Sequence, residues 1–250
     1  MRQFSLRIAG CTLEARVMFD STEHFCRDYL CGGTPDFCVE TTAEDLVFER
    51  KKSEREDALE GIPVRHFSDA YLETIALQRK IAEALFAHDI LLFHGSVVAV
   101  DGQGYLFTAK SGTGKSTHTR LWREVFGQRA VMVNDDKPFL QITDGSVLAH
   151  GTPWNGKHGL GSNLCVPLKA ICLLERGEQN KIEKIPAKDA VFMLLQQSNR
   201  PLAPQKLPKY MELLDKLSGG VEFYKMQCNM DPGAAVLAYE AMSGGQCGFA

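Results

Sequence analysis

The sequence predicts a mixed α/β fold, α+β-like in its order of elements, with largely antiparallel or mixed sheets. The first observation is a hairpin: a strand-like run at Ile90–Val100, a turn at Asp101–Gly104 and a return strand at Tyr105–Thr108. The second is that a glycine-rich segment and a helical pattern over Thr117–Phe126 follow directly. In a doubly wound fold, the strand before such a segment lies in a parallel sheet. An antiparallel hairpin at this place therefore argues against the doubly wound architecture.

Residues 1–66 are predicted to form a small β-rich region of short strands and turns. The sequence alternates there as a strand does in two places: at Phe4, Leu6 and Ile8, then at Phe37, Val39 and Thr41. The mixed-charge run Arg50–Asp57 is interpreted as a solvated turn or sheet edge.

Residues 67–243 are predicted to form the main domain, and 244–250 a flexible tail. Ser68 and Asp69 begin a helix whose apolar stripe continues to Phe86. Strands are expected at Ala130–Val133, Phe139–Ile142, Ser146–His150, Leu164–Leu174 and Val221–Met226, the second and third as a hairpin. Helices are expected at Ala187–Gln197, Lys209–Leu217 and Gly233–Met242, and a glycine-rich loop at Gly151–Ser162.

Composition sets limits on partners and location. The 250 residues are 44% hydrophobic and 24% charged, as in ordinary globular proteins, and the net charge of −3 gives no argument for nucleic acid or anionic membrane. No apolar run approaches the ~20 residues of a membrane helix. Ile8–Cys11 is similar to a lipoprotein cleavage site but lacks the apolar segment of a signal peptide. We therefore expect a cytoplasmic protein whose eight cysteines are reduced and whose cysteine spacing does not favour structural zinc.

Ala109–Ser116 reads Ala-Lys-Ser-Gly-Thr-Gly-Lys-Ser, a P-loop with alanine in place of the first glycine. Backbone N–H groups of such a loop point at phosphate oxygens, and the helix that follows adds its positive dipole end. Lys115 is expected to reach the β- and γ-phosphates, and the Ser116 hydroxyl to hold Mg²⁺. The predicted phosphate-binding residues are Ser111, Gly112, Thr113, Gly114, Lys115, Ser116 and Thr117.

Three further motifs surround this loop in the sequence: His94-Gly95, Asp135-Asp136 and the loop with Lys157 and His158. Phosphoryl transfer needs a phosphate cradle, a Mg²⁺ site and a carboxylate that accepts the hydroxyl proton. The paired aspartates satisfy the last two needs. His94 is suited to orient the base. Lys157 and His158 are predicted to supply positive charge to the phosphates.

In this order the motifs resemble the HPr kinase/phosphorylase group, which shares its nucleotide-binding fold with phosphoenolpyruvate carboxykinases. The resemblance spans roughly residues 90–175 and includes Asn134-Asp135-Asp136 and His158-Gly-Leu-Gly. It implies that 67–243 is an HPr kinase-like nucleotide-binding catalytic domain with a carboxykinase-like P-loop fold, and that the protein forms homo-oligomers. It also implies ATP and Mg²⁺ as cofactors, with Lys115 on the phosphates, Ser116 and Asp136 at the metal, Asp135 as base and His94 beside it.

The chain departs from that group in three ways, the first of which is that it lacks the group's larger N-terminal domain. His158 replaces the arginine of its Arg-Gly-Leu-Gly stretch, and Pro153–Lys157 is an insertion. These departures argue against HPr as the acceptor and against the reverse reaction. The expected function is transfer of a phosphoryl group from Mg-ATP to a serine-type hydroxyl of a peptide, small protein or small molecule.

Two other functions remain open from the sequence. A carboxykinase acting on oxaloacetate would need arginines around its pocket. Between residues 90 and 175 the chain has Arg120, Arg123 and Arg129, all on or just after the P-loop helix. A nucleotide-binding regulatory protein without turnover would need the cradle but not the base. The donor also stays open among ATP, ADP and pyrophosphate, because the cradle recognises phosphates.

Overall fold

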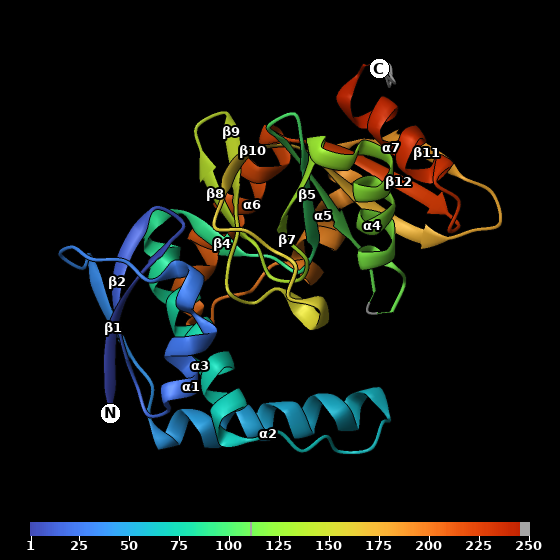
Figure 1. The fold of residues 1–250 in the computed structure, drawn as a ribbon. Coiled ribbons are helices and arrows are strands. Elements are labelled where there is room, and N and C mark those ends of the chain that lie inside the picture. Colours follow the sequence, from blue (N-terminus) through green and yellow to red (C-terminus); the bar gives the residue numbers. More distant parts are fainter. Residues whose placement is uncertain (111, 246–250) are drawn as a thin grey trace. The chain divides into compact units, whose positions relative to one another are not determined.

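The computed structural model describes residues 1–110 and 112–245, and it is a mixed α/β chain, as predicted. It divides into two compact units, Met1–Ala87 and His88–Ala250 (Figure 1). The sequence placed the boundary after residue 66. The structure moves it because the helix Asp69–Leu85 (α3) packs against elements of the first unit. Most of the expected tail, 246–250, lies outside the described residues, as does Ser111. Within the described chain, no helix is long and apolar enough to span a membrane.

The first unit combines a three-stranded sheet with three helices. The strands are β1 (Arg2–Ile8), β2 (Cys11–Val17) and β3 (Phe37–Glu40), and the helices are α1 (Asp20–Phe25), α2 (Ala43–Glu60) and α3 (Asp69–Leu85). β1 pairs with β2 antiparallel, and β2 pairs with β3 parallel. A buried carboxylate ties α3 to this sheet: Glu73 accepts hydrogen bonds from the backbone of Met18 and from the hydroxyl of Thr41.

The prediction of turns and strands alone in this region was wrong. The mixed-charge run Arg50–Asp57 lies inside the 18-residue helix α2. Thr42 and Asp45 form a capping box at its start, which satisfies backbone N–H groups that a helix end otherwise leaves free. Lysine, arginine, glutamate and alanine are good helix formers, so a run of mixed charge is compatible with an exposed helix.

The second unit is built on a nine-stranded mixed sheet in the described residues. Its strands are β4 (Ile90–Leu92), β5 (Ser96–Val100), β6 (Gln103–Thr108), β7 (Ala130–Asn134), β8 (Phe139–Thr143), β9 (Ser146–His150), β10 (Cys165–Arg176), β11 (Lys181–Ile185) and β12 (Glu222–Cys228). The order is β4-β8-β9-β10-β6-β5-β7, and β12 pairs with β10 and β11. The two predicted hairpins, β5–β6 and β8–β9, are confirmed as antiparallel pairs.

The long strand β10 holds this sheet together. Its first residues pair with β9, and its later residues pair in parallel with β6 on one side and β12 on the other. β5 runs antiparallel to both β6 and β7, with Ser96 opposite Phe107 and Val97 opposite Asn134. The carboxyl ends of β6, β7 and β10 and the start of β5 therefore meet at one edge of the sheet.

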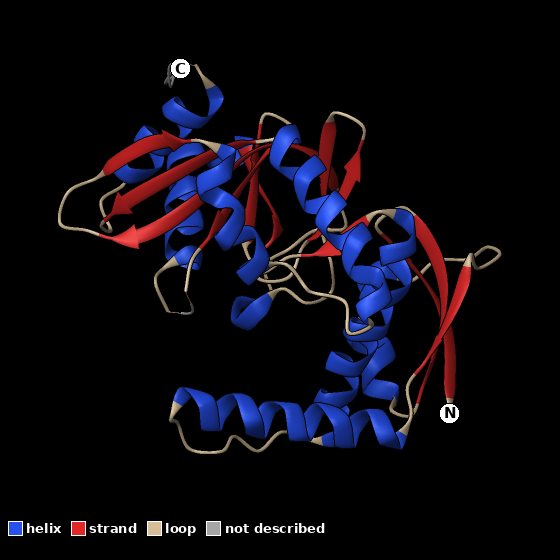
Figure 2. Cartoon of the chain, turned by 180° about the vertical axis from the view of Figure 1, so that it is seen from behind, coloured by secondary structure: helices blue, strands red, loops and turns tan. Residues whose placement is uncertain are grey.

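Helices cover this sheet in the second unit (Figure 2). They are α4 (Lys115–Phe126), α5 (Ala187–Gln197), α6 (Leu207–Gly220) and α7 (Gly233–Ser243). α4 and α7 pack against each other and against the sheet around the buried Trp122, which contacts Tyr105 and Phe107 of β6. The helix after the glycine-rich segment is thus fixed to the strand before it.

Candidate functional site

The glycine-rich loop, residues 109–114, leaves the end of β6 and enters α4 at Lys115 (Figure 1). Gly112 and Gly114 have backbone φ angles of +76° and +125°, which residues other than glycine rarely adopt. A Cβ built on either glycine would meet nothing within 4 Å, so the space beside the backbone is open. This geometry suits a loop whose backbone approaches a ligand closely.

Lys115 lies in the first turn of α4 and turns back over the loop. Its Nζ donates to the carbonyl of Ala109 at 3.2 Å. Burial lowers the pKa of Lys115, and the neighbouring carboxylates of Asp136 and Asp135 oppose that shift. The ammonium is therefore partly withdrawn from water and lies within electrostatic reach of two carboxylates. Ser116 and Thr117 follow in the same turn, both partly buried.

Asp135 follows the end of β7 and is 5% exposed. The hydroxyl of Ser96, at the start of β5, donates to its Oδ1 at 2.6 Å and lies 3.1 Å from Oγ1 of Thr119 on α4. Thr119 in turn donates to the carbonyl of Ser116 at 3.4 Å. Asp135 is therefore connected through two hydroxyls to the first turn of α4.

Asp136 is directed to a different partner. Its Oδ1 lies 3.4 Å from Nε2 of His94, and both side chains are about one-third exposed. Burial raises the pKa of Asp136, against the influence of Lys137 and Lys115. Burial and the same two lysines lower the pKa of His94 to about 3. At neutral pH the imidazole of this pair is therefore uncharged.

Asn134 holds the acidic pair and the 151–162 loop together. Its side-chain oxygen accepts the backbone N–H groups of Asp136 at 2.9 Å and Lys137 at 2.6 Å. Its amide nitrogen donates to Thr152 and to Oδ1 of Asn155. The side chain is fully buried, so each of these bonds forms away from water.

The 151–162 loop is packed tightly onto this arrangement. A Cβ on Gly151 would lie 1.9 Å from the carbonyl oxygen of Ser162, and one on Gly161 would lie 2.2 Å from Oδ1 of Asn155. Trp154 is buried at 5% exposure. Gly156, with φ of +69°, sits beside the side chain of Asp136. Lys157 and His158 lie in the exposed 3-10 turn Gly156–His158 that begins there.

The structure thus brings together at one sheet edge most of the side chains that the sequence selected. His94, Lys115, Asp135 and Asp136 form one electrostatic cluster. Lys157 and His158 follow Gly156, whose backbone lies beside the side chain of Asp136, and both are exposed. Sequence reasoning missed Ser96, Thr119 and Thr152, whose signal was faint: a single polar residue at a strand end or in a helix.

The described residues contain no group of three or more His, Cys, Asp or Glu side chains placed to hold a metal ion. Mg²⁺ is commonly held by one or two carboxylates together with water and substrate phosphates. Ser116 and the acidic pair have the oxygen donors such a site uses: Ser116 lies in the first turn of α4, and both aspartates act electrostatically on the neighbouring Lys115.

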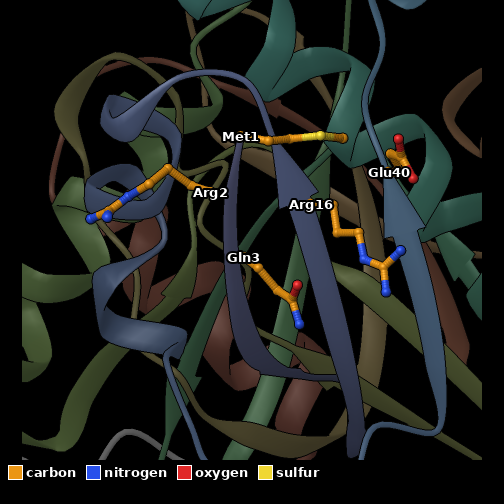
Figure 3. A pocket seen from close by; sticks show the side chains of 5 residues that line it. All are labelled: Met1, Arg2, Gln3, Arg16 and Glu40. Atoms are coloured by element: carbon orange, nitrogen blue, oxygen red, sulfur yellow. The ribbon is translucent and has the colours of Figure 1, made fainter.

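A hollow of about 320 Å³ lies in the first unit, apart from these residues. Figure 3 shows its lining: Met1, Arg2, Gln3, Arg16 and Glu40. Gln3, Arg16 and Glu40 form a row across the three strands. Arg2 pairs with Asp20 and Glu23, and Arg16 pairs with Glu14. Both arginines already have acidic partners. The hollow is therefore a weaker candidate for binding a charged ligand than the site around Lys115 and the acidic pair.

Fold and site define the second unit as a mixed α/β domain in which a glycine-rich loop, an acidic pair and a histidine meet. A family model described as SynChlorMet cassette protein ScmC matches residues 65–230, and the chain belongs to this family. No curated protein matches the chain. Among solved structures, the Hpr(Ser) kinase/phosphatase from Coxiella burnetii is similar with a TM-score of 0.35 and 12% identity, over 61% of this chain and 88% of that one. A likeness at that level does not define a shared fold.

Proposed function

We propose that the second unit is a phosphotransferase that moves a phosphoryl group from Mg-ATP to a hydroxyl of a peptide, small protein or small molecule. The observation that carries the proposal is that Lys115, which begins the helix after an open glycine-rich loop, interacts electrostatically with Asp135 and Asp136. A binder without turnover needs the loop and the lysine, but it has no need of a half-buried carboxylate held against an imidazole. We further propose that this unit has a carboxykinase-like P-loop fold.

In the proposed reaction the acceptor oxygen attacks the γ-phosphorus, the bond from that phosphorus to the ADP oxygen breaks, and the hydroxyl proton passes to a carboxylate. The loop N–H groups and Lys115 bind the phosphates and stabilise their charge. Ser116 is the proposed metal contact on α4. Bound Mg²⁺ would supply further charge neutralisation for the phosphates.

The geometry favours an exchange of the two aspartate roles that the resemblance implied. Asp136 is accessible, has a raised pKa and contacts His94, which suits the proton acceptor. Asp135 is buried on the side of Ser96, Thr119 and the α4 turn that contains Ser116, which suits the metal side. We therefore propose Asp136 as the base, oriented by His94, and Asp135 with Ser116 as the metal contacts.

The test is transfer of label from γ-labelled ATP, with Mg²⁺, into an extract of the source cell, separated into peptide-sized and small-molecule fractions. Lys115→Ala should abolish the label, and Lys184→Ala, at an exposed pair with Glu222, should retain it. Label in peptides would identify a peptide or protein kinase, and label in small molecules a metabolite kinase. Label that persists in Lys115→Ala would refute the assignment of this loop. Tight ATP binding without any product would instead support a regulatory binder.

A further inference from the structure

Arg176, the last residue of β10, contacts the backbone of the glycine-rich loop with its side chain. Its side chain is exposed, and its Nε donates to the carbonyl of Thr113 at 3.3 Å. A second nitrogen of the same guanidinium donates to the carbonyl of Gly112. One side chain thus binds two successive carbonyls of a loop that lies more than sixty positions earlier in the sequence.

The sheet explains how Arg176 reaches the loop. β10 and β6 are parallel, with Leu173 opposite Thr108, so both strands end at the same edge. On its other side, Arg176 lies opposite Cys228 of β12, and the N–H of Gly177 donates to the Cys228 carbonyl at 3.1 Å. The guanidinium therefore extends from a strand end that is paired with β12, three residues beyond the last β10 residue that pairs with β6.

These two bonds fix the orientation of two peptide planes. In a trans peptide the C=O and the next N–H point in opposite directions. With the Gly112 and Thr113 carbonyls directed at Arg176, the N–H groups of Thr113 and Gly114 face away from it. The Thr113 N–H donates to the Lys110 carbonyl at 3.2 Å, which closes the turn. Without such a restraint, Gly112 and Gly114 would give these planes wide rotational freedom.

The guanidinium lies on the carbonyl side of the loop. A phosphate bound by the loop would lie on the N–H side. Arginine suits this role because its planar fork presents several donors in fixed geometry, and lysine offers only a single point charge. The Arg176 contact is therefore compatible with an occupied loop.

We propose that Arg176 is a positioning residue that orders the glycine-rich loop before a polyphosphate binds, by holding the carbonyls of Gly112 and Thr113. The ligand class, a nucleoside di- or triphosphate or pyrophosphate, rests on the proposed function. The ordering of the loop itself does not, because both contacts form within the ligand-free chain.

The first experiment measures hydrogen exchange of the ligand-free full-length protein. In Arg176→Ala, amides in residues 109–116 should exchange several-fold faster than in the wild type. Arg176→Lys should give an intermediate value. The control is Arg129→Ala, which removes an exposed arginine whose partner, Asp101, lies before β6 rather than after it. Unchanged exchange in Arg176→Ala, or an equal increase in Arg129→Ala, would overturn the proposal.

The second experiment measures binding of Mg-ADP and pyrophosphate by calorimetry. Loss of two charge-assisted bonds that order the loop should weaken both ligands roughly tenfold in Arg176→Ala. In transfer assays, Arg176→Ala should raise the KM for the phosphoryl donor and leave kcat unchanged. A fall in kcat with unchanged KM would mean that Arg176 acts in the chemical step, and would refute a positioning role. Wild-type protein that binds neither ligand would refute the proposed function, and the exchange experiment would still decide the role of Arg176.

Discussion

Asp136 and His94 face each other in the candidate site, with Oδ1 of the aspartate 3.4 Å from Nε2 of the histidine. The two residues come from different connections, His94 between β4 and β5 and Asp136 after β7. The backbone joins them as well, because the N–H of Gly95 donates to the carbonyl of Asp136 at 3.0 Å. A neutral imidazole beside a carboxylate of raised pKa is an arrangement that orients a base without neutralising it.

Asp136→Asn should therefore lower kcat by about 10²–10⁴-fold, the usual contribution of a general base. In the wild type, activity should fall as pH drops through the pKa of Asp136, and because that pKa is raised, the fall should begin above the ordinary carboxyl range near ~4. Steady-state kinetics between pH 4 and 8 would measure both effects. Asp135→Asn is the matched variant, and it should mainly raise the Mg²⁺ concentration needed for half-maximal rate. The reverse pattern would return the base to Asp135.

Stability of the second unit should fall in mild acid because three of its histidines are kept neutral. Burial lowers the pKa of His118 and of His150 to about 4, and burial with two lysines lowers that of His94 to about 3. In the unfolded chain a histidine titrates near ~6.5. Between the folded and the unfolded pKa values, the unfolded state binds more protons than the folded state. The free energy of unfolding therefore rises with pH in this range, and it decreases as the pH falls below ~6.5. Each group contributes at most about 1.4 kcal/mol per pH unit.

Tryptophan fluorescence reports the unfolding of the second unit, because Trp122 and Trp154 are the two tryptophans of the chain and both lie in that unit. Urea unfolding at several pH values from 4 to 7 should show a shallower dependence for His150→Gln than for the wild type. His158→Gln, at an exposed position, is the control and should leave the slope unchanged. Equal slopes in all three proteins would contradict a neutral buried His150.

The hairpins and most strand and helix positions of the second unit follow from the sequence because hydrophobic period and turn residues act locally. The helix Ala187–Gln197 was predicted with its observed ends, and the strand β11 was missed because Lys181–Ile185 is mostly polar. Ile90–Val100 was expected as one run. The structure divides it at 93–95, where the Phe93 N–H donates to Pro138 and the His94 N–H to Gln197. Those partners are distant in sequence, so no local pattern encodes the break.

The sequence could select residue types for the candidate site, but it could not say how their side chains pair. Spacing placed Asp135 and Asp136 after a strand but could not say that one faces Ser96 and the other His94. That difference depends on the alternation of side chains at the end of β7 and on the turn that Asn134 stabilises. The contact of Arg176 with the loop carbonyls depends on the parallel register of β10 with β6, which no local pattern encodes.

Asn134 should be essential for this turn. Asn134→Ala leaves the N–H groups of Asp136 and Lys137 without their acceptor in a buried place, which should cost about 3 kcal/mol of stability. Asn134→Asp keeps the acceptor but sets a carboxylate against the oxygens of Thr152 and Asn155, so it should be no better. Chemical denaturation would measure both, with exposed Asn199→Ala as the control. A change below about 0.5 kcal/mol in Asn134→Ala, the range of ordinary surface substitutions, would rule out this role.

Gly151 should tolerate no side chain, because its Cα faces backbone rather than flexible side chains. A Cβ there would lie 1.9 Å from the carbonyl oxygen of Ser162 and 2.8 Å from that of Val133, so the 151–162 loop would have to move away from β7. Gly151→Ala should therefore destabilise the second unit by about 2 kcal/mol or more, as overpacking does. It should also lower transfer activity, because the displaced loop contains Asn155 and lies against Asp136.

The matched control for Gly151→Ala is Gly219→Ala. Gly219 lies in α6, and its added methyl group would meet nothing within 4 Å, so we expect a gain of up to ~1 kcal/mol from helix propensity. If the two variants proved equally stable in urea, the tight packing of the loop on β7 would be wrong.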